Sequence, residues 1–354
     1  MVAKGLDTKH KNFKMLKITN QKNKNISWNL QNINNRTKEI IVFSYSNQVL
    51  TAVNINSDKQ IQNQDVISIG ISSQVSSKNK IIDAIQLGGT IADIAEVFKN
   101  KRQSSGKETE IPCIFFIESD KFHITEYNRE KIHLIGDINL KQSNKLDYLS
   151  PYVPSDSYCE ILDLNPEVDI KNKAQKSNLV FSSKSYLKGW ADTIRISELS
   201  AAYIGPIISP ILYRQARVKD LQNIYVVLEK LSARIYHIES FTAYQYSLPF
   251  GTAQLCNDSN QEENLKSLSN QVTNVLKTHN YESLMERKNI IPIGWPATKS
   301  QSDRLFKRNL NKVKILNLED TTNDLYTNVE SNNKEYLLVK DLCFAAKACM
   351  EILK

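Results

Sequence analysis

Two parts of the chain repeat one arrangement of apolar and polar residues. The stretch 39–55 reads as two strands joined by a turn at 46–48, and a third strand is expected soon after it. The stretch 223–251 runs apolar or alternates throughout, and it is interrupted near Lys230 and near Glu239. We read it as three consecutive antiparallel strands. Each stretch therefore predicts a β-meander.

Helices and buried strands are expected after each meander. Residues 80–101 have helical apolar spacing, but Gly88 and Gly89 predict a break, with Thr90 as the N-cap of a second helix. The stretch 186–214 is apolar with two prolines, and we expect it to be mostly helical and at least half buried. The other expected elements are strands at 110–119, 121–128, 178–185, 289–294 and 312–318 and helices at 264–280, 300–310 and 338–354.

The second meander ends in the sequence Leu248-Pro249-Phe250-Gly251. Pro249 has no N–H group to donate to a sheet ladder, so it suits the end of a strand. Gly251 allows a sharp turn with a positive φ into the segment that follows. The strand is therefore expected to end here and to lead through a tight turn into a helix.

The order of these elements resembles the actin-like, ribonuclease-H-type ATPase fold, in which one meander-containing unit occurs twice. The second half is similar to the PilM family of type IV pilus assembly through the strand end at 248–251, the helix from Asn264 and the strand and turn at 290–297. The resemblance covers roughly residues 39–354. It implies an α/β protein of two lobes, each with a mixed sheet that contains an antiparallel meander. The expected parts are a basic, partly disordered N-terminal tail at 1–38, a first lobe with an inserted subdomain at 39–215, and a second lobe at 216–354.

The nucleotide-binding motifs of that superfamily are degraded here. In the actin-like ATPases each meander opens with an Asp-x-Gly loop, whose glycine admits phosphate oxygens and whose aspartate orients Mg²⁺ or water. The matching places hold Ser-Tyr-Ser at 44–46 and Glu-Lys-Leu at 229–231, and the adenosine-binding Gly-Gly turn is reduced to Gly-Trp-Pro at 294–296. We therefore expect no catalytic residue and no cofactor. Any Mg-ATP that did bind would meet Ser44, Ser46, Glu229, Ser232, Gly251 and Gly294.

Other candidate chemistry is weaker. The sequence has no P-loop, HExxH, GxSxG or Cys/His metal motif. Glu118 and Asp120 follow a buried strand and imitate an acid–base or metal pair, but we interpret them as a solvated strand end. His123 and His237 lie in strand patterns and are interpreted as residues of sheet faces. We therefore expect no metal site.

The formal net charge of +8 belongs to the N-terminal tail. Residues 1–38 hold nine basic side chains and one acid, Asp7, so the rest of the chain is neutral in sum. Such a tail suits contact with an anionic membrane surface or an acidic partner, and the alternative is a solvated, partly disordered leader. Its aromatic residues are only Phe13 and Trp28, so we expect no nucleic-acid partner. Five cysteines without a CxxC pair indicate a reduced, cytoplasmic setting.

The resemblance implies a cytoplasmic scaffold of a type IV pilus or related secretion apparatus, with peripheral contact to the inner membrane. Its implied partner is a cytoplasmic peptide of an inner-membrane pilus-assembly protein, held in a groove of the first lobe. Two alternatives stay open. One is a kinase or phosphohydrolase of the same superfamily with altered phosphate loops, and the other is an unrelated Rossmann-like transferase. A transferase would have parallel βα repeats in place of two meanders.

Overall fold

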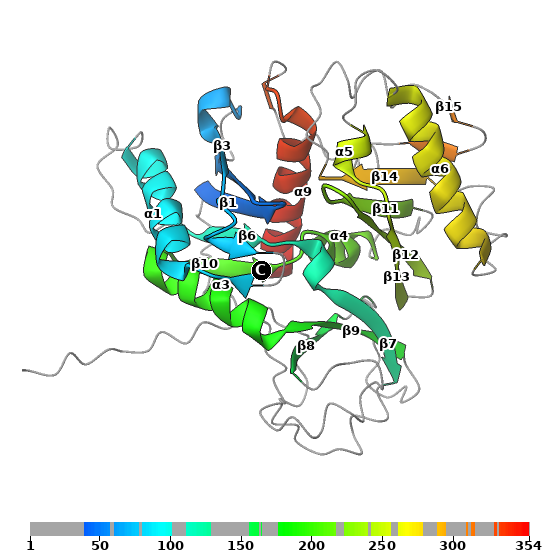
Figure 1. The fold of residues 1–354 in the computed structure, drawn as a ribbon, viewed down its shortest axis with the longest axis horizontal. Helices are drawn as coiled ribbons and strands as arrows, with labels where there is room; N and C mark the ends of the chain where they lie inside the picture. Colours follow the sequence, from blue (N-terminus) through cyan, green and yellow to red (C-terminus); the bar gives the residue numbers. More distant parts are fainter. Residues whose placement is uncertain are drawn as a thin grey trace, which may run out of the picture.

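The structure is a computed structural model, and its elements are drawn in Figure 1. The tail at 1–38, the Trp-Pro pair at 295–296 and most of the helix expected at 300–310 lie outside the described residues. The structure describes residues 39–56, 60–77, 80–100, 111–128, 156–162, 164, 176–216, 223–239, 242–255, 261–278, 289–294, 309–310, 313–315, 329–330 and 333–353.

The first sheet has five strands in the order β10-β6-β1-β2-β3. β1 (Glu39–Ser46), β2 (Val49–Asn56) and β3 (Val66–Gly70) form the predicted antiparallel meander. β6 (Cys113–Phe116) is parallel to β1, and β10 (Ala201–Gly205) is parallel to β6. The central strands β1 and β6 are apolar without alternation because both faces of this sheet are covered.

The second sheet has six strands in the order β13-β12-β11-β14-β16-β15. β11, β12 and β13 form the second predicted meander, β14 and β16 continue the sheet in parallel, and β15 is antiparallel to β16. Both sheets thus combine a meander with parallel strands, which differs from the uniform βα repeats of a Rossmann-like transferase. The strands are β11 (Asn223–Leu228), β12 (Ala233–Glu239), β13 (Thr242–Leu248), β14 (Asn289–Ile293), β15 (Asn309–Leu310) and β16 (Val313–Ile315).

A third sheet is inserted between β6 and β10 in chain order. Its strands β7 (His123–Asn128), β8 (Ser157–Leu162) and β9 (Lys176–Ser183) are all antiparallel, with β9 in the centre. β7 and β9 contact the edge strand β13 of the second sheet, below the two lobes in Figure 1. The insertion therefore bridges from the first lobe to the second.

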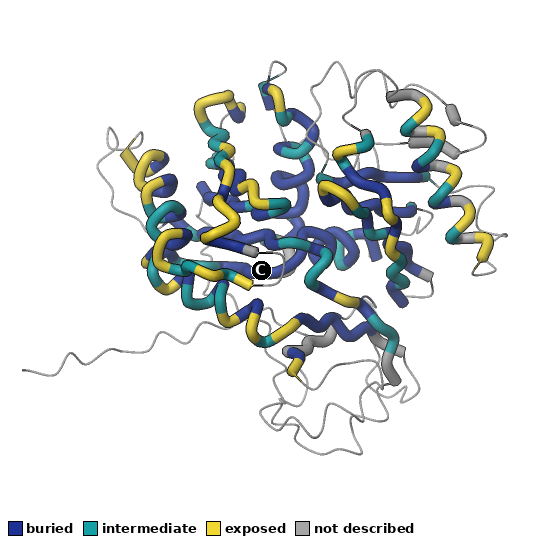
Figure 2. The backbone as a smooth tube through the Cα atoms, in the orientation of Figure 1, coloured by how far each residue is buried: buried dark blue, intermediate teal, exposed yellow. Residues whose placement is uncertain are grey.

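Helices cover both large sheets. α1 (Ala84–Asn100) and α3 (Lys184–Ser197) pack together beside the first sheet, and α4 (Ile208–Gln215) packs with α9 (Tyr336–Leu353) between the lobes (Figure 1). α6 (Gln261–Thr278) packs on the second sheet. Figure 2 shows that α9 is buried along most of its length. No helix in the described part of the chain has the length and apolarity that crossing a membrane requires.

The break expected in the first helix is wrong, because α1 continues through both glycines. A Cβ atom on Gly88 would lie 2.7 Å from the carbonyl oxygen of Thr193, so glycine at this position lets α1 approach α3 closely. Thr90 lies inside the helix, where its hydroxyl donates to the carbonyl oxygen of Gln86 at 2.9 Å. The two glycines therefore do not break the helix.

The stretch 186–214 is mostly helical, as predicted, but the strand β10, which was not expected, separates α3 from α4. The sequence of β10, Ala-Ala-Tyr-Ile-Gly, is a five-residue apolar run that shows neither helical nor strand periodicity. Periodicity cannot distinguish such a run from a buried helical turn. The pairing with β6 decides its conformation.

The last helix joins the two lobes. α9 contacts β1, β2 and α4 of the first lobe, while its residue Leu337 packs in the core of the second. The sequence analysis placed this helix in the second lobe, and its division of the chain at residues 38 and 215 stays a prediction.

Candidate functional site

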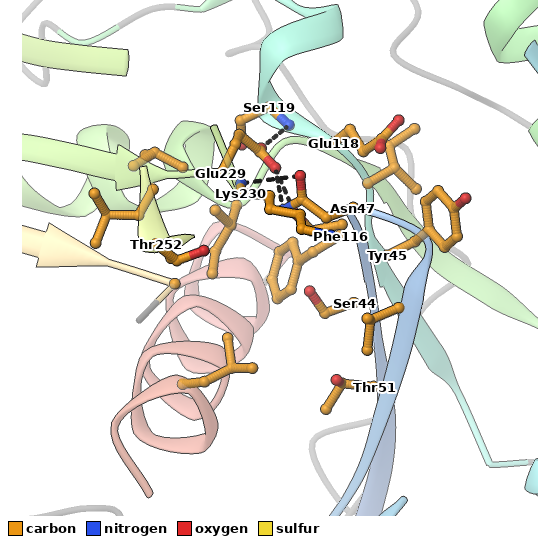
Figure 3. A pocket seen from close by; sticks show the side chains of 18 of the residues that line it. Ser44, Tyr45, Asn47, Thr51, Phe116, Glu118, Ser119, Glu229, Lys230 and Thr252 are labelled. Carbon is orange, nitrogen blue, oxygen red and sulfur yellow. Dashed lines mark hydrogen bonds between the residues drawn. The ribbon is translucent and has the colours of Figure 1, made fainter. Parts of the chain in front are cut away.

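A cavity of about 370 Å³ lies where the turns of the two meanders face one another (Figure 3). Its polar lining includes Ser44 and Thr51 of the first sheet and Thr252 of the second lobe. Its apolar lining comes from both lobes and from α9, through Phe116, Ile117, Ile207, Val227, Leu228 and Leu338. The cavity thus lies between the two turns that the sequence analysis compared with phosphate loops.

The turn between β1 and β2 consists of two residues with left-handed backbones. Asn47 has a φ of 53° and Gln48 a φ of 62°, as in the type I′ turns that match the twist of a tight hairpin. Asparagine tolerates this conformation better than most residues do. The turn therefore holds the Asn47 side chain toward the second lobe without a glycine (Figure 3).

The turn between β11 and β12, at 229–232, is held from behind by the start of α5 (Thr252–Leu255). The carbonyl oxygens of Glu229 and Lys230 accept the N–H groups of Thr252 and Ala253, at 2.8 and 2.9 Å. This fixes the backbone of the turn against the segment that follows the second meander.

Gly251 makes that contact sterically feasible. Its φ is not positive, so the expected reason for the glycine is wrong. A Cβ atom at this position would lie 2.3 Å from the carbonyl oxygen of Glu229 and 2.6 Å from the backbone of Lys230. The sequence Leu-Pro-Phe-Gly ends in glycine because two backbone segments pack there without room for a side chain.

One carboxylate joins the two turns. Glu229 is buried, and its Oε2 accepts hydrogen bonds from the hydroxyl of Ser46 and from Nδ2 of Asn47, the latter at 3.2 Å. Its Oε1 accepts the backbone N–H of Ser119 at 3.2 Å. In return, the N–H of Lys230 donates to Oδ1 of Asn47 at 2.9 Å (Figure 3). We call this set, Glu229 with Ser46, Asn47 and Ser119, the inter-lobe latch.

Two carboxyl groups at the cavity have raised pKa values. The pKa of Glu229 is raised to about 7, chiefly by burial. The hydrogen bond from Ser46 opposes this shift, and the charges of Asp120 and Glu118 add to it. Burial likewise raises the pKa of Glu118 to about 7, with Asp120 acting in the same direction. Oε2 of Glu118 also accepts the hydroxyl of Tyr186 at 3.2 Å. The cleft therefore gathers acidic groups whose ionised forms are disfavoured by burial and by one another.

Gly294 ends β14 with a φ of 83°, a backbone conformation that favours glycine. Its N–H donates to a carboxylate oxygen of Asp341 on α9 at 2.9 Å. A Cβ atom there would lie 3.3 Å from the carbonyl oxygen of Leu228. This glycine thus connects the second sheet to α9 at the cavity wall.

The structure brings together most of the residues that the sequence analysis selected. Ser44, Ser46, Glu229 and Gly294 line the cavity, whereas Ser232 closes the second turn and Gly251 packs behind it. Their role in nucleotide binding stays a prediction.

The sequence analysis did not select Asn47 or Ser119, which complete the latch. The turn at Asn47 was predicted, but the contact that it makes with Glu229 spans 182 positions of the chain. No local pattern reveals such a contact.

The interpretation of the acids after β6 needs a correction. Glu118 is half-buried and lines the cavity, so it does not belong to a solvated strand end. Asp120 pairs with Lys121 at 2.8 Å. Within the described residues, no cluster of histidine, cysteine and acidic side chains is arranged to hold a metal ion.

The two strand histidines lie on sheet faces, as predicted. His123 stacks on Phe181 and His237 on Tyr244, in each case with ring centroids 5.1 Å apart. They lie outside the cavity lining.

Comparison of the sequence with protein-family models and with curated proteins gives no match. The fold is similar to that of a chain of the PilM-PilN type IV pilus biogenesis complex, with a TM-score of 0.58 and 10% sequence identity over 90% of this chain and 99% of that chain. A protein of unknown function with an actin-like ATPase fold from Bacteroides thetaiotaomicron gives a TM-score of 0.40 at 13% identity, over 82% of this chain and 93% of that chain. The cytoplasmic domain of EpsL, an inner-membrane component of the type II secretion system of Vibrio cholerae, gives 0.40 at 9% identity, over 86% of this chain and 95% of that chain.

The duplicated topology and the similarity to the pilus-complex chain agree on the class of the protein. The chain has the actin-like, ribonuclease-H-type fold, with a meander-containing mixed sheet in each of two lobes. The PilM-like resemblance seen in the sequence is confirmed for the fold. At 10% identity, it transfers neither an activity nor a partner.

Proposed function

We propose that the chain is a cytoplasmic actin-like scaffold of a type IV pilus or related secretion apparatus, and that it works without hydrolysing ATP. The inter-lobe latch carries this proposal. In nucleotide-dependent members of the superfamily the phosphates lie between the two meander turns, whereas here the turns are hydrogen-bonded to each other. The similarity of fold to a chain of a pilus biogenesis complex supports the cellular setting.

Two backbone donors of the cleft are already engaged. A phosphate loop binds through N–H groups that glycine leaves accessible to phosphate oxygens. Here the N–H of Lys230 is bonded to Asn47, and the N–H of Ser119 is bonded to Glu229. A triphosphate would have to break both bonds and would find no glycine turn in exchange.

The charges of the cavity also disfavour a triphosphate. Its lining includes three carboxyl groups, Glu118, Glu229 and Glu335, against one lysine, Lys230. A triphosphate would add several negative charges to a partly buried cleft, where like charges repel more strongly than in water. The engaged N–H donors and the carboxyl groups of the cavity therefore both disfavour nucleotide binding.

Calorimetric titration with Mg-ATP and Mg-ADP tests this part of the proposal. We expect no saturable heat at micromolar nucleotide and no release of inorganic phosphate above that of buffer. A micromolar dissociation constant for the wild type that is lost in Glu229→Ala would contradict the proposal, because it would place a nucleotide at the latch.

The proposed partner is a cytoplasmic peptide of an inner-membrane pilus-assembly protein, held by the first lobe. Fluorescence anisotropy would test it with labelled peptides that cover the cytoplasmic segments of single-span membrane proteins encoded beside this gene. Micromolar binding of one peptide, and not of its scrambled version, would support a specific groove. Equal binding of both versions, or of neither, would count against the scaffold.

We further propose that the basic tail at 1–38 contacts anionic lipid. Each lysine near such a surface contributes on the order of 1 kcal/mol, and the attraction is screened within about 8 Å at physiological ionic strength. Full-length protein should therefore sediment with anionic liposomes at low salt, and a chain without residues 1–38 should not. Equal sedimentation of the two forms would exclude the tail as a membrane contact.

One observation favours an alternative function, a phosphohydrolase. Burial raises the pKa values of Glu118 and Glu229 to about 7, in the range that suits a general acid or base at neutral pH. Glu229 is already bound by three donors, which leaves Glu118 as the candidate base. Release of phosphate from a panel of phosphate esters and polyphosphate, abolished by Glu118→Gln, would establish this activity in place of the scaffold.

A further inference from the structure

We propose that the inter-lobe latch is proton-linked: the cleft between the meander turns closes with uptake of a proton at Glu229 and opens when that proton is lost. The proposal uses the contact between the turns but does not depend on a pilus setting or on the absence of nucleotide. It assigns a conformational device to residues that form the interface between the lobes.

The geometry places an acidic group where its charge is poorly compensated. Only 6% of Glu229 is exposed, and its three donors are the neutral groups of Ser46, Asn47 and Ser119. Among the described residues, no lysine or arginine forms an ion pair with it. Closing the cleft therefore buries a charge unless the carboxyl group is protonated.

The charged groups around the latch strengthen this effect. On the first lobe, Glu118 and Asp120 both oppose ionisation of Glu229. Lys121 is paired with Asp120 at 2.8 Å. On the second lobe, the guanidinium of Arg234 donates to the backbone carbonyl of Asp120 at 3.1 Å.

The remaining neighbours contribute no positive charge to Glu229. The exposed residue Lys230 engages the latch through its backbone N–H. Tyr186 donates to Glu118, and burial raises the pKa of the Tyr236 phenol, so both tyrosines are neutral at physiological pH.

The latch also has hydrogen-bonding capacity for the neutral acid. A protonated carboxyl group carries one O–H donor and keeps lone pairs that accept. The hydroxyl of Ser46 can both donate and accept. It can therefore accept a hydrogen bond from the O–H of Glu229, while Asn47 and Ser119 continue to donate to Glu229. Protonation therefore removes the buried charge without removing the contact.

The direction of the pH dependence follows from linkage. The pKa of Glu229 is raised from 4.5 to about 7 in the closed cleft, so the closed state holds the proton more tightly than a solvated carboxyl group does. The stabilisation of the closed state is fully present below about pH 4.5 and is lost as the pH rises through about 7.

The hinge of this opening is formed by amide contacts between the inserted sheet and the second lobe, which do not titrate with pH. The side-chain amide of Gln245 on β13 accepts the N–H of Ile124 at 2.7 Å and donates to the carbonyl of Phe122 at 3.2 Å. Oδ1 of Asn178 on β9 accepts the N–H of Ala243 at 2.7 Å. These amide contacts keep the inserted sheet on the second lobe while the turns separate.

Hydrogen exchange of the full chain tests the latch through the backbone N–H groups of Ser119 and Lys230, both bonded across the cleft. After correction for the intrinsic exchange rates, their protection in the wild type should fall between pH 6 and pH 8.5. For a single proton with this pKa difference, the fall between these two pH values should be roughly tenfold. Glu229→Gln should keep the same protection at both pH values, because its amide is neutral throughout.

The controls separate a proton switch from general loosening. Glu335→Gln removes one charge from the same cavity and leaves the latch intact, so it should behave like the wild type. Glu118→Gln removes one opposing charge, so its loss of protection on raising the pH should be smaller. This second variant keeps the test decisive even where Glu229→Gln does not fold. Protection independent of pH in the wild type, or an equal fall in all the folded variants, would overturn the proposal.

Discussion

A Cβ atom on Gly251 would lie 2.3 Å from the carbonyl oxygen of Glu229. The N–H of Thr252, the next residue, donates to that same oxygen at 2.8 Å. Glu229 is the residue whose carboxyl group joins the two meander turns, so the segment after the second meander supports the latch from behind. The position of a functional side chain is thus set by the absence of a side chain at a residue 22 positions away.

Replacing Gly251 by alanine should destabilise the protein by about 1–3 kcal/mol, as overpacking of a well-packed site does. The added methyl group meets backbone atoms of Glu229 and Lys230, which cannot rotate away as a flexible side chain can. Urea denaturation measures the change in the free energy of unfolding. Gly70→Ala is the control, because a Cβ atom on Gly70 has no atom within 4 Å. Equal midpoints for both variants would show that the approach at Gly251 is not tight.

The adjacent glycines of α1 should respond to alanine in opposite directions. Gly88→Ala places a methyl group 2.7 Å from the carbonyl oxygen of Thr193 and should be destabilising. A Cβ atom on Gly89 has no atom within 4 Å, so Gly89→Ala should stabilise the helix by about 0.5–1 kcal/mol. Thermal unfolding of the two variants checks the signs. Two destabilised variants would indicate that α1 needs backbone flexibility at this point.

The two meanders could be predicted from the sequence because the residues that determine their strands and turns lie close together in the chain. The apolar runs that form β1 and β2, and those that form β11 and β12, are separated by short turns. By contrast, β10 has five residues, and its conformation is decided by pairing with β6, a strand 85 or more positions earlier in the chain. A segment of this length carries too little periodicity to identify its own structure.

The candidate site could be predicted only in part. Glu229 was found because it keeps a carboxylate at a position where related folds have one. Its partner Asn47 is 182 positions away and Ser119 is 110 positions away, so only the packing of the lobes reveals that they meet. The solvated role expected for Glu118 was wrong for the same reason, since Glu229 and Arg234 of the second lobe hydrogen-bond to the residues that follow it.

Gln245 should be needed for the contact between the inserted sheet and the second lobe. Its amide both accepts and donates, as a peptide group does at a sheet edge. Gln245→Glu keeps the acceptor for Ile124 but turns a carboxylate oxygen toward the carbonyl of Phe122. We expect a loss of about 1–3 kcal/mol, the usual penalty for an unsatisfied buried partner. Faster hydrogen exchange at the N–H of Ile124 should accompany this loss.

The control for this prediction is Gln64→Glu, the same change at an exposed position. Surface substitutions of this kind normally alter stability by less than about 0.5 kcal/mol. Unchanged exchange at Ile124 in Gln245→Glu would show that packing, and not the amide, holds the inserted sheet in place.

Glu118→Gln should make the protein more stable at alkaline pH and leave it nearly unchanged at acidic pH. The pKa of Glu118 is raised from 4.5 to about 7, chiefly by burial, so ionisation opposes folding. The stabilisation that its protonated form provides is complete below about pH 4.5 and is lost as the pH rises through about 7. Glutamine is neutral throughout, and its carbonyl oxygen can still accept the hydroxyl of Tyr186. Above pH 7 we therefore expect a gain on the order of 1–2 kcal/mol, reduced by the partial exposure of the side chain.

Urea denaturation at pH 5 and pH 8.5 measures the difference, with Glu335→Gln as the control for a change of net charge alone. A constant difference between the variant and the wild type at both pH values would mean that Glu118 ionises as a solvated carboxyl group does.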